Sequence, residues 1–335
     1  MDFTVLYPEA LYSDDSVERG IFGPGIEVRV RNVATIADLS DADCASADGL
    51  MLFRHFLPDA ALARFTHLRA IVRMGVGTDR VDRAAAAARQ ILVCNVPDYG
   101  TTEVADHAIA LALALRRGLL LHHEAQRADP PAPWIYIDNP MIRRSDALGY
   151  GILGLGRIGT AVALRAKAFG ARVMAYDPYQ PNGVERALGI DRARTLGELL
   201  AHSDTLSIHT PLTPETRGML DFAALSRLPR HAIVVNTARG PILDLDALER
   251  LMRAGHIAAA GLDVLPIEPP TEPVPTLLAA YRAREPWLDG RLIITPHSAF
   301  HTPEAWQDIR VKSAETMRAA LLGPRPQNVI APETP

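Results

Sequence analysis

The stretch that most constrains the fold is GYGILGLGRIGTAVALRAKAFGARVMAYD, residues 149 to 177. Gly154, Gly156 and Gly159 follow an apolar run and open a segment with the periodicity of an amphipathic helix, and a second apolar run ends at Asp177. A strand, a glycine turn, a helix and a second strand are the parts of a βαβ unit, whose two strands lie parallel. The chain therefore has to build a parallel sheet around this segment.

The spacing within this stretch predicts a dinucleotide site. The three glycines permit a tight turn, a close approach of the backbone to a pyrophosphate and close packing of helix on strand. Asp177 stands 18 positions after Gly159, where its carboxylate would accept hydrogen bonds from a ribose. The same charge would repel a 2′-phosphate, and the following residues, DPYQ, offer no arginine, so NAD is favoured over NADP. The alternative is a glycine turn needed only for packing.

Short apolar runs alternate with helical segments along the whole chain, which predicts an α/β protein with parallel sheets. The expected strands lie within residues 3–8, 49–53, 68–75, 91–97, 147–156, 171–177, 205–212, 231–238, 257–264 and 291–297. A long helical segment, residues 101–127, has Thr102 as its expected N-cap. An amphipathic helix is expected near the C-terminus, with Pro303 in its first turn and Gly323 at its end.

Composition narrows the class of partner. Of 335 residues, 48% are hydrophobic and 22% charged, with a net charge of −4, so no basic surface for nucleic acid is expected. No apolar stretch approaches the length of a membrane span, and the N-terminus lacks the features of a secretory signal, so a cytoplasmic protein without membrane contact is expected. Cys44 and Cys94 lack metal-ligand spacing and are expected to be buried.

Four polar residues stand at ends of the expected strands, where a parallel sheet binds its ligands. They are Arg239 in NTARGPILD, Asp263 and Glu268 in GLDVLPIEPP, and His297 in TPHSAF. Singly, each is typical of a solvated surface residue. Together, beside a dinucleotide site, they match hydride transfer to a 2-oxo acid: Arg239 for the carboxylate and carbonyl, His297 as proton donor, and Glu268 to support the protonated histidine.

The chain resembles the D-isomer-specific 2-hydroxyacid dehydrogenases. The resemblance rests on GILGLGRIG, HTPLTPETRGML, NTARGPILD, GLDV with its following EP, and TPH, and it continues in IVRMGVGTDRVD and CNVP. Within that family, GRIGTAVALRAKAFGARVMAYDPYQPNGVERALGI is most similar to the branch of C-terminal binding proteins. The family resemblance implies two Rossmann-like, doubly wound domains: a flavodoxin-like substrate domain, residues 1–101 and 296–335, and an NAD-binding Rossmann domain, residues 102–295. It also implies a homodimer formed through the long helical segment.

The resemblance further implies roles for individual residues. Arg239, Glu268 and His297 would be catalytic. The NAD contacts would be Val104, Gly154, Gly156, Arg157, Ile158, Gly159, Asp177, Thr210, Pro211, Thr216, Thr237, Ala238, Asp263 and Ala299. The substrate, a small anionic 2-oxo or 2-hydroxy acid, would be bound by Arg73, Gly75, Val76, Gly77, Arg239 and Phe300. No metal is implied.

Three features depart from the C-terminal binding proteins. Val76 stands where that branch has a polar residue, so the backbone N–H remains for the substrate but no side-chain hydroxyl. Phe300 stands where that branch has tryptophan and would border the substrate side chain, so a different or larger 2-oxo acid is expected. Tyr99, Met74 and His301 are further candidates for the side-chain pocket. The chain also has extra length within residues 269–290, which either decorates the surface or walls the active site.

Two other functions stay open at this stage. One is an NAD(H)-responsive scaffold like the corepressors of that branch. The other is a dehydrogenase of a different small anion, such as phosphite. Formate is disfavoured because the formate enzymes have glutamine where this chain has Glu268.

Overall fold

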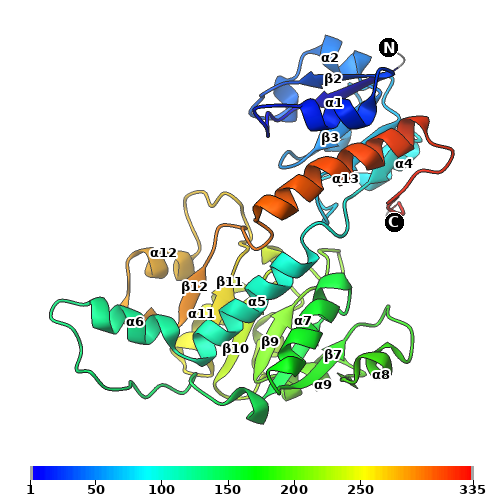
Figure 1. Cartoon of the computed structure of the whole chain (residues 1–335). Coiled ribbons are helices and arrows are strands. Elements are labelled where there is room, and N and C mark those ends of the chain that lie inside the picture. Colours follow the sequence, from blue (N-terminus) through cyan, green and yellow to red (C-terminus); the bar gives the residue numbers. More distant parts are fainter. Residues whose placement is uncertain (1–2, 333–335) are drawn as a thin grey trace. The chain divides into compact units, whose positions relative to one another are not determined.

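The computed structural model describes residues 3–332 and divides the chain into two compact units. The first unit contains residues 1–99 and 302–335, and the second contains residues 100–301 (Figure 1). The predicted boundaries, after residues 101 and 295, differ from these by a few residues. The difference assigns the turn that carries His297 to the second unit.

The first unit is built on a parallel sheet of five strands in the order β2-β1-β3-β4-β5. The strands are β1 (Phe3–Tyr7), β2 (Ile26–Val30), β3 (Gly49–Leu52), β4 (Ala70–Arg73) and β5 (Leu92–Cys94). Four of them confirm predicted strands. The edge strand β2 was missed because its sequence, IEVRV, alternates apolar and charged residues over only five positions.

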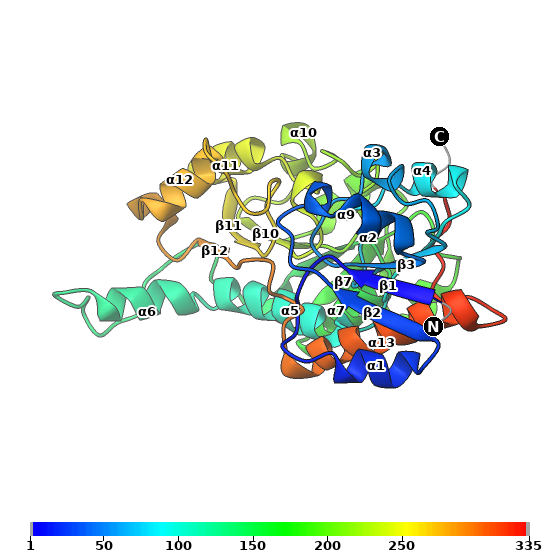
Figure 2. The same ribbon diagram turned by 90° about the horizontal axis from the view of Figure 1, so that it is seen from above.

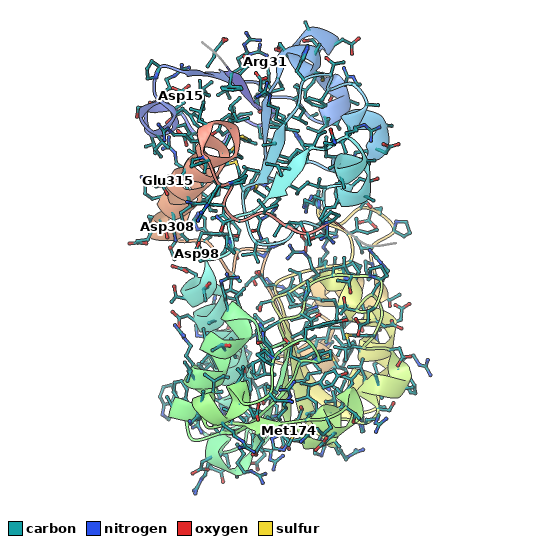
Figure 3. The ribbon with its side chains drawn as sticks, turned by 90° about the vertical axis from the view of Figure 1, so that its right-hand side faces the viewer. Asp15, Arg31, Asp98, Met174, Asp308 and Glu315 are labelled. Carbon is teal, nitrogen blue, oxygen red and sulfur yellow. The ribbon has the colours of Figure 1, made fainter. Side chains whose placement is uncertain are left out.

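Helices cover both faces of this sheet. They are α1 (Ser16–Phe22), α2 (Asp41–Ser46), α3 (Asp59–Leu62), α4 (Arg83–Ala88) and α13 (Pro303–Leu322), with a short 3-10 turn, η1 (Ile36–Asp38). The last helix confirms the prediction, because Thr302 caps it, Pro303 opens it and Gly323 follows it. Lys312 of α13 lies 3.1 Å from Asp98 and 2.8 Å from Asp308, and the two carboxylates lie near each other in Figure 3.

The second unit is built on a parallel sheet of seven strands in the order β12-β11-β10-β9-β6-β7-β8. The strands are β6 (Gly149–Leu153), β7 (Arg172–Tyr176), β8 (Asp191–Arg192), β9 (Thr205–Ile208), β10 (Ala232–Asn236), β11 (Ile257–Leu262) and β12 (Leu292–Ile294). All six predicted strands are present, and only the two-residue β8 was missed. Both sheets therefore confirm the predicted α/β fold of two parallel, Rossmann-like units.

The helices of the second unit lie on both faces of its sheet, and α5 and α7 pack against each other (Figure 1). They are α5 (Thr101–Arg116), α6 (Leu119–Arg127), α7 (Arg157–Ala168), α8 (Val184–Leu188), α9 (Leu196–His202), α10 (Phe222–Leu225), α11 (Leu245–Arg253) and α12 (Thr276–Arg282). Three 3-10 turns complete the unit: η2 (Ser145–Ala147), η3 (Gly240–Ile242) and η4 (Pro286–Leu288).

The long helix predicted over residues 101–127 is wrong in two respects. Gly118, with φ +60°, breaks it into α5 and α6, because a left-handed residue cannot continue a right-handed helix. The N-cap is Gly100, and Thr102 lies inside the first turn with its hydroxyl bonded to Glu103. Both views show α6 and the loop after it reaching away from the seven-stranded sheet (Figure 2).

Two smaller findings concern the cysteines and membrane contact. Cys44 and Cys94 are both buried, as predicted, and burial raises the pKa of the Cys94 thiol to about 11. Within residues 3–332 no helix combines the length and the apolar character that a membrane crossing requires.

Candidate active site

The glycine turn lies at the point where the order of the seven-stranded sheet reverses. β7 pairs with one side of β6, whereas β9 pairs with the other side. The loops after β6 and β9 therefore separate there, which leaves the crevice where open α/β sheets bind nucleotides. At Gly154, with φ +92°, an added Cβ would lie 2.8 Å from the backbone nitrogen of Thr210, so only glycine brings the two loops this close.

The other two glycines have different surroundings. A Cβ at Gly159 would lie 2.0 Å from the carbonyl oxygen of Gly154, so this glycine permits α7 to pack against the turn. A Cβ at Gly156 would meet nothing within 4 Å. Gly156 is also the N-cap of α7, and no side chain caps that helix end. The exposed backbone beside an uncapped helix N-terminus fits a pyrophosphate, and the next two residues, Arg157 and Ile158, form the first turn of α7.

Asp177 follows β7 and faces the same turn. Its Oδ2 accepts a hydrogen bond from the backbone of Leu155 at 2.8 Å, and its Oδ1 accepts one from the backbone of Tyr179 at 2.9 Å. Each carboxylate oxygen keeps a second lone pair, so the group can still accept from ribose hydroxyls. Arg192 also lies near Asp177, where an arginine could bind a 2′-phosphate. Its guanidinium instead donates to three backbone carbonyls, at Asp177, Gln180 and Pro181.

Further predicted cofactor residues lie on the neighbouring loops. The Thr216 hydroxyl donates to the carbonyl of Pro211 at 2.7 Å, and the Thr210 hydroxyl donates to the same carbonyl at 2.9 Å. After β10, the hydroxyl of Thr237 is buried and has no hydrogen-bond partner among residues 3–332. A buried hydroxyl without a partner is uncommon, and here it lies on a loop at the carboxyl edge of the sheet. The residues present therefore fit NAD.

Arg239 is held by the end of β10. The side chain of Asn236, which is fully buried, donates to the carbonyl of Arg239 at 3.0 Å and accepts from the backbone of Ala238 at 3.0 Å. Gly240 then packs so closely that a Cβ would lie 2.0 Å from the carbonyl carbon of Leu265. The turn is thus fixed on both sides of Arg239. Asn236 was not among the predicted site residues, although it begins the NTARG motif.

His297 and Glu268 form a close pair. The Nδ1 atom of His297 lies 2.6 Å from Oε2 of Glu268, and Oε1 of Glu268 accepts from the backbone of Leu265 at 2.9 Å. The two side chains are 34% and 24% exposed, so the pair is only partly open to solvent. With Nδ1 bonded to the carboxylate, Nε2 is the nitrogen that can exchange a proton with a ligand.

The environment favours the ionised form of Glu268. Burial acts to raise the pKa of this carboxyl, but the hydrogen bonds from His297 and Leu265 and the positive charges of His297 and Arg239 outweigh it. The net result is a pKa below the ordinary value of 4.5. The positive charge of Arg239 therefore lowers the pKa of Glu268, although the sequence predicted a role for Arg239 only toward the substrate.

Asp263 is buried beneath the turn that carries His297. Its Oδ1 accepts from the hydroxyl of Thr295 at 2.6 Å and from the backbone of Ser298 at 2.9 Å, and its Oδ2 accepts from the backbone of Ala299 at 3.0 Å. Its own carbonyl accepts from the backbone of His297 at 2.8 Å. The structure thus brings the predicted residues Asp263 and Ala299 together, with Asp263 acting on the protein backbone.

The first unit carries the loop predicted to bind substrate, at the carboxyl end of β4. The guanidinium of Arg73 folds over Gly75, where a Cβ would lie 1.4 Å from Nη1 of the arginine. Asn95 donates to the carbonyl of Val76 at 2.7 Å. The side chain of Val76 is exposed. Gly77 follows directly. Met74 is fully buried, so it belongs to the core of this unit, and the expectation that it lines a pocket is wrong.

Two further arginines lie at the same edge of the five-stranded sheet. The Arg54 and Arg73 guanidinium carbons lie 5.5 and 5.9 Å from the ring centroid of Phe53, and that of Arg80 lies 4.7 Å from the ring of Phe56. Arg80 also donates to the carbonyl of Arg54. Arg54 and Arg80 have no ion-pair partner among residues 3–332. Sequence reasoning missed both, although Arg54 directly follows an expected strand.

Of the remaining predicted residues, Tyr99 belongs to the first unit, and Val104, Ala238, Phe300 and His301 belong to the second. Val104 lies in the first turn of α5 and is buried, and Ala238 is half-buried beside Arg239. Phe300 is half-buried, with its Cβ 3.2 Å from the position of a Cβ on Gly100. Among residues 3–332 no group of three or more histidines, cysteines or carboxylates is arranged to hold a metal ion.

The extra segment between Glu268 and Pro296 does two things. Leu277 and Ala280 of α12 are buried in the core beside α11, so this part is not surface decoration. The preceding proline-rich loop walls a groove of about 520 Å³ whose other wall is residues 241–246. Arg239, Glu268 and His297 are not among the residues that line this groove.

Comparison with known proteins places this geometry in a family. Residues 109–299 match the family described as "D-isomer specific 2-hydroxyacid dehydrogenase, NAD binding domain". D-3-phosphoglycerate dehydrogenase of Mycobacterium leprae is 36% identical over 323 residues, and that of Mycobacterium tuberculosis is 37% identical over 325. Each alignment covers 94% of this chain but 57% of the relative, so the chain spans little more than half the length of these proteins.

A solved structure agrees over both units. The D-lactate dehydrogenase of Aquifex aeolicus, solved with NAD and lactic acid, is 26% identical, with a TM-score of 0.81 and coverage of 96% of each chain. These relatives do not test the likeness to the C-terminal binding proteins, which stays a prediction. The glycine turn, the carboxylate after β7 and the family match together establish that the chain belongs to the D-isomer-specific 2-hydroxyacid dehydrogenases and that its second unit is their NAD-binding domain.

Proposed function

We propose that this protein is an NAD-dependent dehydrogenase that interconverts a D-2-hydroxy acid and the corresponding 2-oxo acid. The observation that carries the proposal is the His297–Glu268 pair, 2.6 Å apart and under the positive charge of Arg239. A proton carrier, its carboxylate partner and an anion-binding guanidinium are the groups that this reaction requires. All three follow strands of the sheet that carries the glycine turn.

In the reduction, His297 supplies the proton and Arg239 holds the substrate. NADH, held by the glycine turn and Asp177, would supply the hydride for the 2-carbon of the oxo acid. Nε2 of His297 gives its proton to the carbonyl oxygen, which becomes the hydroxyl, and Nδ1 stays bonded to Glu268 throughout. Arg239 binds the carboxylate and carbonyl oxygens and so fixes the plane of the reacting group. In the oxidation, Nε2 takes the hydroxyl proton.

The cofactor residues follow from the same proposal. Gly154, Gly156 and Gly159 would admit the pyrophosphate, and Asp177 would accept from the adenosine ribose. The free hydroxyl of Thr237 would bond to the cofactor beside the 209–216 loop. Val104 and Ala299 would contact the nicotinamide end.

Substrate contacts are proposed for the first unit as well. Arg73 and the backbone of Gly75 to Gly77 would bind the carboxylate, and Phe300 of the second unit would border the substrate side chain. The phenyl ring offers no hydrogen-bond donor at that position, so a charged group on the substrate side chain would have to be bound by other residues.

The test is turnover of NADH with a series of 2-oxo acids of increasing size, with D- and L-2-hydroxy acids and NAD for the reverse direction. Oxidation of the D-isomer alone supports the proposal. Tight NADH binding without turnover of any acid would contradict it and favour the scaffold. Turnover of phosphite with NAD, without turnover of any 2-hydroxy acid, would favour a dehydrogenase of a different small anion.

A substrate with a second anionic group is a more specific candidate. The relatives named D-3-phosphoglycerate dehydrogenase prompt it, and one feature supports it: Arg54, Arg73 and Arg80 gather around Phe53 and Phe56 at the carboxyl edge of the five-stranded sheet. Like charges repel one another. A cluster without carboxylate partners for two of its members is therefore suited to an anion such as a phosphate or a second carboxylate.

This candidate is tested by Arg54→Gln and Arg80→Gln. The KM for D-3-phosphoglycerate is expected to rise about 10- to 100-fold, the effect of losing a charge-assisted hydrogen bond, while the KM for a monoanionic 2-hydroxy acid stays unchanged. Arg69→Gln is the matched control, because Arg69 also stacks on a phenylalanine, at 5.0 Å, but precedes β4 at the other edge. Equal changes for both substrates would contradict the candidate.

A homodimer stays a proposal. It is supported by the side chains on and after α6, where Leu119 is 58%, Trp134 92% and Tyr136 73% exposed. Apolar side chains this exposed and this close in sequence favour an interface. Sedimentation of the protein and of Trp134→Glu would test it, with dissociation of the variant as the expected result.

A further inference from the structure

We propose that His107 is a positioning residue for His297, acting through Thr295 and Asp263. The inference rests on the proposed function, in which His297 carries the proton. His107 lies in the second turn of α5, more than 180 residues from His297 in sequence.

The contacts form a continuous chain. Nε2 of His107 lies 3.0 Å from the hydroxyl of Thr295 and 3.9 Å from Oδ1 of Asp263. The Thr295 hydroxyl lies 2.6 Å from that Oδ1 atom. Asp263 then bonds to the backbone of the turn on both sides of its carboxylate and accepts from the backbone of His297. Two side-chain hydrogen bonds thus connect α5 to the carboxylate under the proposed proton carrier.

The donors and acceptors in this chain have a fixed direction. The hydroxyl of Thr295 has one proton, and the 2.6 Å distance to a carboxylate that cannot donate requires that this proton point to Asp263. The oxygen of Thr295 can then only accept from His107, so Nε2 of His107 must carry a hydrogen. The imidazole fixes the hydroxyl, the hydroxyl fixes Oδ1, and the carboxylate fixes the turn.

The turn needs such support because His297 has a left-handed backbone, with φ +52°. This conformation is unfavourable for a residue with a Cβ and persists where surrounding contacts impose it. The hydrogen bonds from Ser298 and Ala299 to Asp263 supply those contacts. Any rotation of the Asp263 carboxylate would move the backbone of the turn and with it the imidazole of His297.

His107 also lies close in sequence to one of the two places where the chain passes between the units. α5 begins at Thr101, directly after the crossing at residues 99–100, and the turn with His297 ends at the crossing at residues 301–302. The two segments touch, since a Cβ on Gly100 would lie 3.2 Å from that of Phe300. The bond from His107 to Thr295 therefore joins the helix that follows the first crossing to the segment that precedes the second crossing.

The experiment compares His107→Leu, His107→Gln, Thr295→Val and the double variant His107→Leu/Thr295→Val. kcat for 2-oxo acid reduction, Kd for NADH and the thermal midpoint are measured for each. Asp106→Asn is the matched control, because it removes another contact of α5, the 2.5 Å ion pair with Arg165, without touching Thr295.

For His107→Leu, kcat is expected to fall about 10- to 100-fold, the loss typical of groups that orient metal-binding histidines, with the Kd for NADH unchanged. His107→Gln should restore most of the activity, because its amide nitrogen reaches the position of Nε2. Thr295→Val should equal His107→Leu, and the double variant should be no worse than either single variant.

Three results would overturn the inference: His107→Leu as active as Asp106→Asn, additive losses in the double variant, or no rescue by glutamine. Each leaves the proposed function intact if His297→Asn is inactive. If His297→Asn retains full activity, the proposed function itself fails, whatever the His107 variants do. Should His107→Leu not fold, Thr295→Val alone and its comparison with Asp106→Asn decide the matter.

Discussion

The carboxyl edges of the two sheets present opposite kinds of chemistry. At the edge of the seven-stranded sheet, Asp263 and Glu268 have both carboxylate oxygens bonded, and the backbone around them is fixed. At the edge of the five-stranded sheet, Arg54 and Arg80 carry charge without carboxylate partners among the described residues. The difference suggests that one edge moves a proton and the other attracts an anion.

The physical requirements of the two tasks explain the difference. Proton transfer needs an imidazole held in one orientation, and hydrogen-bonded carboxylates in a partly buried site provide this. Attraction of an anion needs positive charge that is not neutralised, and it tolerates mobile side chains. Substitutions at the first edge should therefore change kcat, and substitutions at the second should change KM.

The largest effect is expected for His297→Asn. Asparagine tolerates a left-handed backbone better than alanine does, so the turn is retained while proton transfer is lost. kcat should fall about 10²- to 10⁴-fold, with NADH binding unchanged by fluorescence titration. A variant that keeps its kcat would show that the edge of the seven-stranded sheet does not carry the proton.

Arg239→Lys should have the next largest effect. An ammonium group cannot bind two oxygens in the planar arrangement of a guanidinium. kcat/KM for the 2-oxo acid should therefore fall about 10- to 100-fold, which corresponds to about 1.5–3 kcal/mol. The KM for NADH, measured at saturating acid, should not change. Equal losses for both ligands would indicate a disturbed fold instead of a lost substrate contact.

A smaller effect is expected for Asp263→Asn. The N–H groups of Ser298 and Ala299 donate to different oxygens of the carboxylate, and in the amide one of these positions becomes an NH2 group that cannot accept, so one of the two N–H groups loses its bond. Stability should fall by about 2 kcal/mol, which calorimetry would detect as a lower Tm of several degrees. An unchanged Tm and kcat would mean that the turn does not depend on this carboxylate.

The smallest effect is expected for Asp177→Ala. Alanine removes the carboxylate that would accept from the ribose, so the KM for NADH should rise about tenfold, the cost of one charge-assisted hydrogen bond. Alanine also removes the charge that would repel a 2′-phosphate. The relative rate with NADPH should increase. A variant that keeps the preference of the natural protein would assign cofactor choice to another residue.

Much of the fold could be predicted because parallel strands are buried and read as apolar runs. The strands that were missed, β2 and β8, lie at sheet edges, where the sequence is polar or the strand is only two residues long. The break at Gly118 was missed because apolar residues on both sides continue the helical periodicity. A glycine within a helical pattern is often tolerated, so the sequence alone does not show whether its backbone turns left-handed and ends the helix.

The candidate site divides in the same way. Arg239, Glu268 and His297 follow strands and carry recognisable motifs, so their meeting could be anticipated. His107 and Arg54 could not be found by the same reasoning, because the contact of His107 joins distant segments and Arg54 lies in no recognised motif. Asn236 begins NTARG and bonds only to neighbouring backbone groups, so that motif could have indicated it. The bond from His107 to Thr295 spans 188 positions, and no local pattern encodes it.

The most direct test of the account is the pH dependence of kcat/KM for 2-oxo acid reduction in the natural protein and in Glu268→Gln. Because the pKa of Glu268 lies below 4.5, this carboxylate is ionised throughout the neutral range, and the fall in reduction with rising pH reports loss of the proton from His297. Glutamine removes the negative charge beside the imidazole, so the fall in rate should move to lower pH. An unchanged profile, or a shift to higher pH, would contradict the assignment of His297 and Glu268 as the proton-transferring pair.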